Sequence, residues 1–337
     1  MDCQVYVASE ICAILSEKLY VVLPLPNCGD YSLVIDVVCL VKHYGFVKAV
    51  DDITFQVEPG EIFGMLGPNG AGKTTTVEII EGLRQADSGH VSVMGLDVSR
   101  VPSRIKQRIG IQLQAPSLLP LLRVEEILDT FAGFYEHHLS VVEVLELLSL
   151  QESRKVLVKN LSGGQQQRLS VAMAFVNDPE IAFLDEPTTG LDPQARRGLW
   201  SVIEGMRSKG KTVFLTTHYM EEAERLCDRV AIIDYGKIIA IGTPNDLIRE
   251  YFKERAIQFE MEAPPSLSVL QDFPGATQVA VDAGEVVIYS KNIPATMSAL
   301  LRYAENSRPA GQLKDLHVRQ ATLEDVFLKL TGRKIRE

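Results

Sequence analysis

The sequence predicts an α/β core followed by a smaller α+β domain. From Leu33 to about Leu247, segments with the apolar pattern of strands alternate with segments that have the pattern of helices. Near the start of this region a glycine-rich turn, GPNGAGKTT, joins a strand to a helix. After DLIREYFKER the composition changes, and the segments follow in an order typical of a compact α+β domain. We therefore expect a core at residues 33–250 and an accessory domain at residues 251–337.

The first 32 residues share neither pattern, and we expect residues 1–32 to form an N-terminal extension that packs weakly or is disordered. In the core, ITFQV, EIFGML and HVSVMGLDV predict strands, and TTVEIIEGLRQ predicts a helix. Apolar residues at i, i+3 and i+4 between Val124 and Leu150 predict a helical insert, at about residues 115–175. The α/β pattern returns with strands EIAFLDEP and KTVFLTTH, helix ARRGLWSVIEGMRSKG, and RVAIIDYGKIIAIGTP as a hairpin turning at Tyr235–Gly236.

Composition and charge narrow the functional classes. The chain has 337 residues, with 34 Lys and Arg against 44 Asp and Glu, and a formal net charge of -10. This balance argues against a general nucleic-acid-binding surface, so no nucleic acid is expected as a partner. The five cysteines have no metal-ligand spacing. An odd, scattered set of this kind is more typical of reduced thiols in a cytosol than of a disulfide framework. No window has the roughly 20 uncharged apolar residues that span a bilayer, so we expect a membrane role only through a partner chain.

GPNGAGKTT fits the phosphate-loop pattern G-x-x-x-x-G-K-[ST], after strand EIFGML and before a helix. An ordinary glycine-rich turn is the alternative, and this context disfavours it. The glycines would let backbone amides wrap the phosphates of ATP, Lys73 would reach the β and γ oxygens, and Thr74 would ligate Mg²⁺. The predicted ATP-binding residues of this loop are Gly67, Pro68, Asn69, Gly70, Ala71, Gly72, Lys73, Thr74 and Thr75.

Two adjacent carboxylates end the apolar strand IAFLDEP. Taken alone they are a weak signal, because an Asp at a strand end often caps the next turn. Beside a phosphate loop, we expect Asp185 to hold Mg²⁺ through water and Glu186 to polarise the attacking water as general base. His218 ends strand TVFLTTH. Its position, roughly 30 residues after the carboxylates, favours a contact with the γ-phosphate over a purely structural role.

Two further side chains carry little information by themselves. Gln114 in IGIQLQAP follows another predicted strand, at the join to the helical insert. Tyr44 in KHYG precedes the core, where it is placed to stack on adenine, with a core aromatic as the alternative.

A second phosphate-binding pattern lies in LSGGQQQRLS, where Ser162 is a good helix N-cap and two glycines open the first turn. One domain has no use for two γ-phosphate sites. Two copies packed head to tail do, because each can offer its Ser162–Gly164 segment to the ATP held by its partner's phosphate loop. This arrangement predicts a homodimer with two composite sites across a two-fold interface. The alternative is a helix with a serine cap and a glycine-rich entry.

Together GPNGAGKTT, LSGGQ, LDEP, TTGLDP and His218 resemble the nucleotide-binding domain of ABC transporters, over about Leu33–Leu247. LSGGQQQR and LDEPTTGLDP are most similar to the ATPase subunits of bacterial and archaeal drug- and antibiotic-resistance exporters, in which ATPase and permease are separate chains. TLEDVFLKLTGR is similar to the C-terminal domain of that branch. The resemblance implies a P-loop NTPase core of the ABC type with an antiparallel β subdomain.

The resemblance also implies roles for matching positions. Tyr44 would stack on adenine, Gln114 would touch Mg²⁺ or the attacking water, and Asp192 of TTGLDP would couple the two sites of a dimer. The signature residues that would act in trans are Ser162, Gly163, Gly164 and Gln165. The implied catalytic set is Glu186, His218, Gln114 and Lys73, and the implied metal set is Thr74, Gln114 and Asp185.

The leading functional hypothesis is the ATP-binding and ATP-hydrolysing subunit of an ABC transporter that exports its cargo. ATP and Mg²⁺ would close a homodimer on the cytoplasmic face of the membrane, and the dimer would drive separately encoded integral-membrane permease subunits. One alternative is a soluble ABC ATPase of the repair, chromosome or translation type, and another is a nucleotide-gated regulator. The short insert, the single phosphate loop and the acidic charge disfavour the repair-type alternative.

Overall fold

The computed structural model describes residues 33–100, 102–112, 118–261, 264–282, 284–306 and 313–332. The extension expected at residues 1–32 lies outside these described residues. The chain divides between Ile241 and Gly242 into two compact units. The sequence predicts a boundary near residue 250 instead. The difference concerns helix α9 (Pro244–Tyr251), which contacts α12 (Leu323–Thr331) and so belongs to the second unit.

One sheet of the first unit is antiparallel and has four strands in the order β2-β1-β4-β5. Its strands are β1 (Ile35–Tyr44), β2 (Val47–Val57), β4 (Ser88–Val93) and β5 (Leu96–Asp97). HVSVMGLDV therefore forms two strands rather than the predicted one. Met94 and Gly95 both have positive φ, 51° and 69°, and this is the backbone of a tight hairpin turn.

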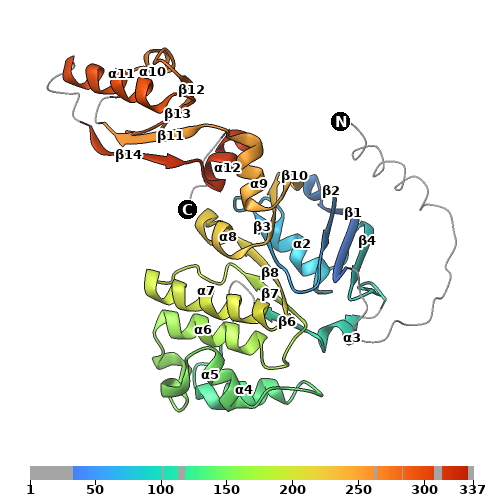
Figure 1. Cartoon of the computed structure of the whole chain (residues 1–337). Helices are drawn as coiled ribbons and strands as arrows, with labels where there is room; N and C mark the ends of the chain where they lie inside the picture. Colours follow the sequence, from blue (N-terminus) through green and yellow to red (C-terminus); the bar gives the residue numbers. More distant parts are fainter. Residues whose placement is uncertain are drawn as a thin grey trace. The chain divides into compact units, whose positions relative to one another are not determined.

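The second sheet of the unit has six strands in the order β10-β9-β3-β8-β7-β6 (Figure 1). Its strands are β3 (Ile62–Leu66), β6 (Ile109–Gln112), β7 (Ile181–Asp185), β8 (Thr212–Thr217), β9 (Arg229–Asp234) and β10 (Lys237–Gly242). Neighbouring pairs from β6 to β9 are parallel. All residues of β3, β7 and β8 are buried, and most of them are apolar, as expected for central strands of a parallel sheet.

Helices α3, α6, α7 and α8 contact this sheet, and three helices, α4 to α6, form the predicted insert. The helices after the sheet strands are α2 (Lys73–Ile80), α3 (Pro102–Lys106), α7 (Pro193–Ser208) and α8 (Met220–Leu226). Between β6 and β7 lie α4 (Val124–Ala132), α5 (Val141–Leu147), α6 (Gly163–Ala174) and two short 3₁₀ turns, Gln151–Ser153 and Val158–Asn160. Figure 1 shows α4, α5 and α6 together at the end of the unit away from β1 and β2.

Helix α2 ends at Ile80, earlier than the predicted segment TTVEIIEGLRQ. Gly82 adopts φ 71°, and a left-handed glycine after the last turn is a usual helix stop. The core of the unit joins the two sheets and the buried face of α2. In it the rings of Phe55 and Phe63 stack at 5.4 Å, and Phe63 and Phe214 lie 5.5 Å apart.

The second unit has the predicted α+β composition. Its sheet is antiparallel with the order β12-β13-β11-β14. After α9 the elements are β11 (Arg255–Glu260), α10 (Leu267–Gln271), β12 (Ala276–Asp282), β13 (Glu285–Ser290), α11 (Ile293–Asn306), β14 (Lys314–Gln320) and α12. Apolar residues of β11 and β13 form its core with Leu270 and Leu300 of α10 and α11. Within the described ranges, no helix combines the length and apolar character needed to cross a membrane.

Candidate nucleotide site

The carboxyl ends of three neighbouring strands meet at one edge of the six-stranded sheet. In the register of this sheet, Leu66 of β3 pairs with Thr217 of β8, and Asp185 of β7 pairs with Thr216. The glycine-rich loop after β3, the carboxylates at the end of β7 and His218 after β8 therefore lie at the same edge. In open α/β sheets, ligands bind outside the carboxyl ends of the strands.

At two positions of the loop from Gly67 to Gly72, neighbouring backbone atoms leave no space for a side chain, so only glycine fits. A Cβ at Gly67 would lie 2.3 Å from the carbonyl oxygen of Ile233. A Cβ at Gly72, where φ is 109°, would lie 2.2 Å from the carbonyl oxygen of Ala49. Gly72 is also the N-cap of α2. The first amides of a helix have no partner within it, and this glycine-lined start is a shape that suits a phosphate group.

Lys73 is the first residue of α2 and is 5 % exposed. Its Nζ donates to the carbonyl oxygen of Gly67 at 2.8 Å and of Pro68 at 3.3 Å, and it lies 3.6 Å from Glu186 Oε1. Burial lowers the pKa of Lys73, and the negative charges of Glu186 and Asp185 act against that shift. The ammonium group is thus folded back over its own loop, next to the predicted general base.

Asp185 is buried at the end of β7 and is held by two hydroxyls. Thr216 Oγ1 donates to its Oδ1, and Thr74 Oγ1 donates to its Oδ2 at 3.4 Å. Burial raises the pKa of Asp185, while the hydrogen bond from Thr216 lowers it. The sequence did not single out Thr216. Only the strand register, which pairs it with Asp185, could have pointed to it.

The donor set at this position fits a magnesium ion bound together with a nucleotide. Thr74 and Asp185 offer a hydroxyl and a carboxylate, and hard oxygen donors are what Mg²⁺ prefers. Among the described residues, no group of three or more His, Cys, Asp or Glu side chains is arranged to hold a metal ion by itself. A site with few protein ligands is usual for Mg²⁺ that arrives on phosphate groups.

Glu186 follows directly, with a positive φ of 49° that is uncommon for a residue with a side chain. Its Oε2 lies 3.2 Å from His218 Nδ1 and accepts a hydrogen bond from Thr189 Oγ1 at 3.3 Å. The hydrogen bond with His218 lowers the pKa of Glu186, against the effect of burial. The predicted base is therefore a buried carboxylate between an imidazole and the Lys73 ammonium.

The sequence predicts His218 as a contact of the γ-phosphate. In the structure its ring lies against Glu186 and packs on the ring of Tyr219 at an interplanar angle of 40°, with the two ring centroids 4.1 Å apart. His218, Glu186, Asp185 and Lys73 thus form one cluster, as the sequence predicts, and the pairing within the cluster is the additional finding.

Ser162 caps α6 and its side chain accepts a hydrogen bond from the amide of Gln165 at 3.3 Å. Ser162 and Gly163 are exposed, and a Cβ at Gly163 would meet no atom within 4 Å. A Cβ at Gly164 would meet only side chains of Leu191 and Ala195, at 3.6–3.7 Å. The start of α6 is therefore open to a molecule from outside, while α2 and its phosphate loop lie elsewhere in the unit (Figure 1).

Asp192 and Tyr44 are both at exposed positions. Asp192 caps α7, and its Oδ1 accepts hydrogen bonds from the amides of Gln194 and Ala195 at 2.9 Å. Tyr44 ends β1 and is 42 % exposed, so it is not a core aromatic. The guanidinium of Arg84 lies 5.4 Å from the centroid of its ring.

Gln114 lies outside the described residues. The nearest described glutamine is Gln112, at the end of β6, which is buried and donates from Nε2 to the carbonyl oxygen of Asp185 at 3.4 Å. The strand that leads to Gln114 therefore ends next to the Asp185–Glu186 pair.

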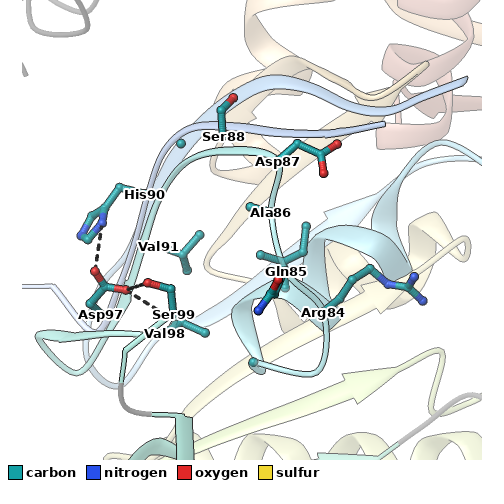
Figure 2. Close-up of a pocket in the computed structure, with 13 residues that line it drawn as sticks. Arg84, Gln85, Ala86, Asp87, Ser88, His90, Val91, Asp97, Val98 and Ser99 are labelled. Carbon is teal, nitrogen blue, oxygen red and sulfur yellow. Dashed lines mark hydrogen bonds and ion pairs between the residues drawn. The ribbon is translucent and has the colours of Figure 1, made fainter. Parts of the chain in front are cut away.

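A cavity of about 440 Å³ opens at the other end of α2, between that helix and β4 and β5 (Figure 2). Asp97 lies at its wall and accepts a hydrogen bond from Ser99 Oγ at 2.6 Å, and His90 Nδ1 is 3.7 Å from it. None of the residues that the sequence predicts for ATP, Mg²⁺ or catalysis lines this cavity. It is separate from the cluster at the sheet edge.

Comparisons with known proteins agree with this geometry. The profile of the family described as ABC transporter matches residues 50–189. The Nod factor export ATP-binding protein I of Ralstonia nicotianae is 38 % identical over 319 residues, covering 93 % of this chain and 98 % of that protein. The protein of the same name from Burkholderia pseudomallei is 41 % identical over 300 residues, covering 87 % of this chain and 95 % of that protein. The chain belongs to the ABC transporter family.

Solved structures of ABC proteins have a fold similar to that of this chain. An ATP-binding subunit of an ABC transporter is 31 % identical with a TM-score of 0.59, covering 65 % of this chain and 93 % of that one. The ATP-binding cassette MJ0796, solved as a dimer in a post-hydrolysis state with ADP and Pi, is 25 % identical with a TM-score of 0.58, covering 62 % of this chain and 98 % of that one. The chain is thus an ATP-binding subunit of an ABC transporter and an ATPase by family.

Proposed function

We propose that this ABC protein works as a homodimer that closes on two ATP molecules, with each copy completing the site of the other. The start of α6 supports the proposal, because Ser162 and Gly163 are exposed and a Cβ at Gly163 would meet no atom within 4 Å. The phosphate loop and α6 lie in different parts of the unit, so a second chain must supply the α6 that faces a given phosphate loop. The dimeric cassette MJ0796 is a relative of the same fold.

In the proposed site, the phosphate loop and Lys73 hold the phosphates, and Tyr44 stacks on adenine. Thr74, Asp185 and Gln114 would hold Mg²⁺, which when bound would neutralise charge on the phosphates. Gly67, Pro68, Asn69, Gly70, Ala71, Gly72 and Thr75 complete the cradle, and Gly164 and Gln165 complete the signature segment with Ser162 and Gly163. Asp192, at the start of α7, is proposed to couple the two sites.

The chemistry is assigned to Glu186 and His218. At neutral pH Glu186 is ionised, because its pKa is lowered by His218. It can therefore accept a proton from a water placed in line with the γ-phosphate. Lys73, whose Nζ lies 3.6 Å from Glu186, would donate charge-assisted hydrogen bonds to the phosphate oxygens. His218 keeps the carboxylate in place through the 3.2 Å contact.

For the cellular role, we propose an export motor bound peripherally to the cytoplasmic face of the membrane, acting on separately encoded permease subunits. The relatives named as Nod factor export ATP-binding proteins support export. Energy reaches the permease because ATP binds more tightly to the closed dimer than to the open one, and only such a difference can move a conformational equilibrium. Copurification with an integral-membrane chain from solubilised membranes tests the permease partner. A partner without any membrane span would contradict it.

The observation that carries the assignment is the cluster of Lys73, Asp185, Glu186 and His218 at one sheet edge. Glu186→Gln removes the base without changing its size. We expect turnover of ATP to fall roughly 10²-fold or more, with ATP affinity unchanged. Lys73→Ala should instead weaken binding of a fluorescent ATP analogue. Turnover near the wild-type rate in the Glu186→Gln variant would refute the role of Glu186.

A further inference from the structure

A further buried carboxyl group of the first unit, that of Glu222, has none of the roles assigned above. Glu222 on α8 is fully buried, and Trp200 Nε1 on α7 donates a hydrogen bond to its Oε1 at 3.0 Å. Burial raises the pKa of Glu222, and the hydroxyls of Thr217 and Thr188 and the charge of Arg196 act against this shift. Burial of a carboxyl group costs free energy unless the group is hydrogen-bonded, so the groups around Glu222 indicate what it stabilises.

Glu222 accepts a hydrogen bond from α7, and the residues that lower its pKa lie in three segments. Trp200 and Arg196 lie on α7, Thr217 is the last residue of β8, and Thr188 lies in the turn after β7. These segments also carry the proposed site, since β7 ends at Asp185 and is followed by Glu186, α7 begins after Asp192, and His218 follows β8. The bond to Trp200 therefore joins α8, which begins directly after Tyr219, to α7, which begins directly after Asp192.

From Arg196 on α7, a set of contacts runs to the base. The guanidinium of Arg196 lies 4.5 Å from the centroid of the Tyr219 ring, and that ring is 4.1 Å from the ring of His218. The amide of Tyr219 donates to Thr217 Oγ1 at 2.9 Å, which fixes the turn at the end of β8. His218 Nδ1 then lies 3.2 Å from Glu186 Oε2.

We propose that Glu222 is a positioning residue for ATP hydrolysis. Its carboxylate holds α7 and the Tyr219 turn together, so that His218 keeps its contact with Glu186. The proposal rests on the roles of Glu186 and His218 stated above. It differs from a purely structural role in one consequence: the effect of changing Glu222 must pass through His218.

The experiment is a double-mutant cycle of Glu222→Gln and His218→Ala, with Glu221→Gln as the matched control on the exposed side of the same helix. The Glu222→Gln change keeps the size of the side chain and an acceptor for Trp200, and replaces the carboxyl group with an amide. In otherwise wild-type protein we expect kcat per folded molecule to fall roughly 10- to 100-fold, the range for a small misplacement, with the KM for ATP changed less than about 2-fold.

In the His218→Ala background, Glu222→Gln should lower kcat by less than about 2-fold, because the residue it acts through is already gone. Glu221→Gln should leave kcat unchanged in both backgrounds. Equal losses in both backgrounds, or a rise in KM, would overturn the proposal. So would a kcat loss that matches the loss of folded protein measured by circular dichroism. If His218→Ala is impaired and Glu222→Gln is not, only the role of Glu222 fails and the proposed function stands.

A second variant covers the case in which Glu222→Gln does not fold. Trp200→Phe removes the N–H donor to the carboxylate and keeps an aromatic side chain in the core. We expect the same pattern, with a smaller fall in kcat and a fall that again disappears without His218. A Trp200→Phe protein with wild-type kcat in the presence of His218 would contradict the proposal.

Discussion

The substitution Glu81→Gln should make the first unit more stable at neutral pH. Glu81 follows α2 directly and is 2 % exposed. Burial raises its pKa from 4.5 to about 8, and the negative charges of Asp185 and Glu78 push in the same direction. The side chain is thus protonated in the folded protein at pH 7, whereas in the unfolded chain it is ionised.

The sign and size follow from proton linkage. Because the folded pKa lies above the unfolded one, the folded state binds the proton more tightly, and this stabilisation is fully present below about pH 4.5. It is lost as the pH rises through about 8. At 1.36 kcal/mol per unit, the loss between pH 4.5 and pH 7 is roughly 3 kcal/mol. That is about a third of the 5–15 kcal/mol by which a typical domain is stable.

The assay is urea unfolding at several pH values, followed by fluorescence of Trp200, which is the one tryptophan of the chain and lies in the first unit. A glutamine at this position cannot ionise. The free energy of unfolding of Glu81→Gln, relative to that of wild type, should therefore be roughly 3 kcal/mol higher at pH 7 than at pH 4.5. The change with pH is the test, because burial of the amide has a cost that does not depend on pH. Glu152→Gln, at an exposed position, should show no such change. A stability difference that stays constant from pH 4.5 to 7 would refute the reasoning.

Two further predictions concern local contacts. Arg123 is the N-cap of α4 with no side-chain cap hydrogen bond, so Arg123→Thr should stabilise the first unit by roughly 0.5–1 kcal/mol in urea unfolding, and Arg123→Ala should not. An equal effect of the two variants would contradict this. Tyr44→Ala should weaken binding of a fluorescent ATP analogue by roughly 10-fold through lost stacking, whereas Phe46→Ala, on the same hairpin and fully exposed, should change it less than about 2-fold. Equal losses would contradict adenine stacking on Tyr44.

Much of the fold and the site could be predicted because the signals are local. The phosphate loop, the carboxylate pair and the serine cap of α6 each depend on a few consecutive residues and on the element beside them. The hairpin at Tyr235–Gly236 was predicted for the same reason, and both residues have the positive φ of such a turn. Alternation of apolar segments was sufficient for the α/β order of the first unit and the α+β order of the second.

The contacts that the sequence did not predict depend on which strands lie side by side. Thr216 meets Asp185 because β8 lies next to β7, and the pairing of His218 with Glu186 has the same origin. Nothing in the sequence around Glu222 distinguishes it from the exposed Glu221 beside it except the helical period. The boundary near residue 250 was misplaced because α9 continues the polar and apolar pattern of the core, and its packing against α12 is a tertiary contact.

The most direct test is the mass of Glu186→Gln protein in solution with Mg-ATP, measured by light scattering. The account predicts a particle of two chains, formed only when ATP is present. Adding Gly163→Asp should abolish the pair without unfolding the chain, since that position has room for a side chain and a carboxylate there would repel a partner's phosphates. If the Glu186→Gln protein keeps the mass of one chain at saturating Mg-ATP, or if Gly163→Asp pairs equally well, the shared site does not exist.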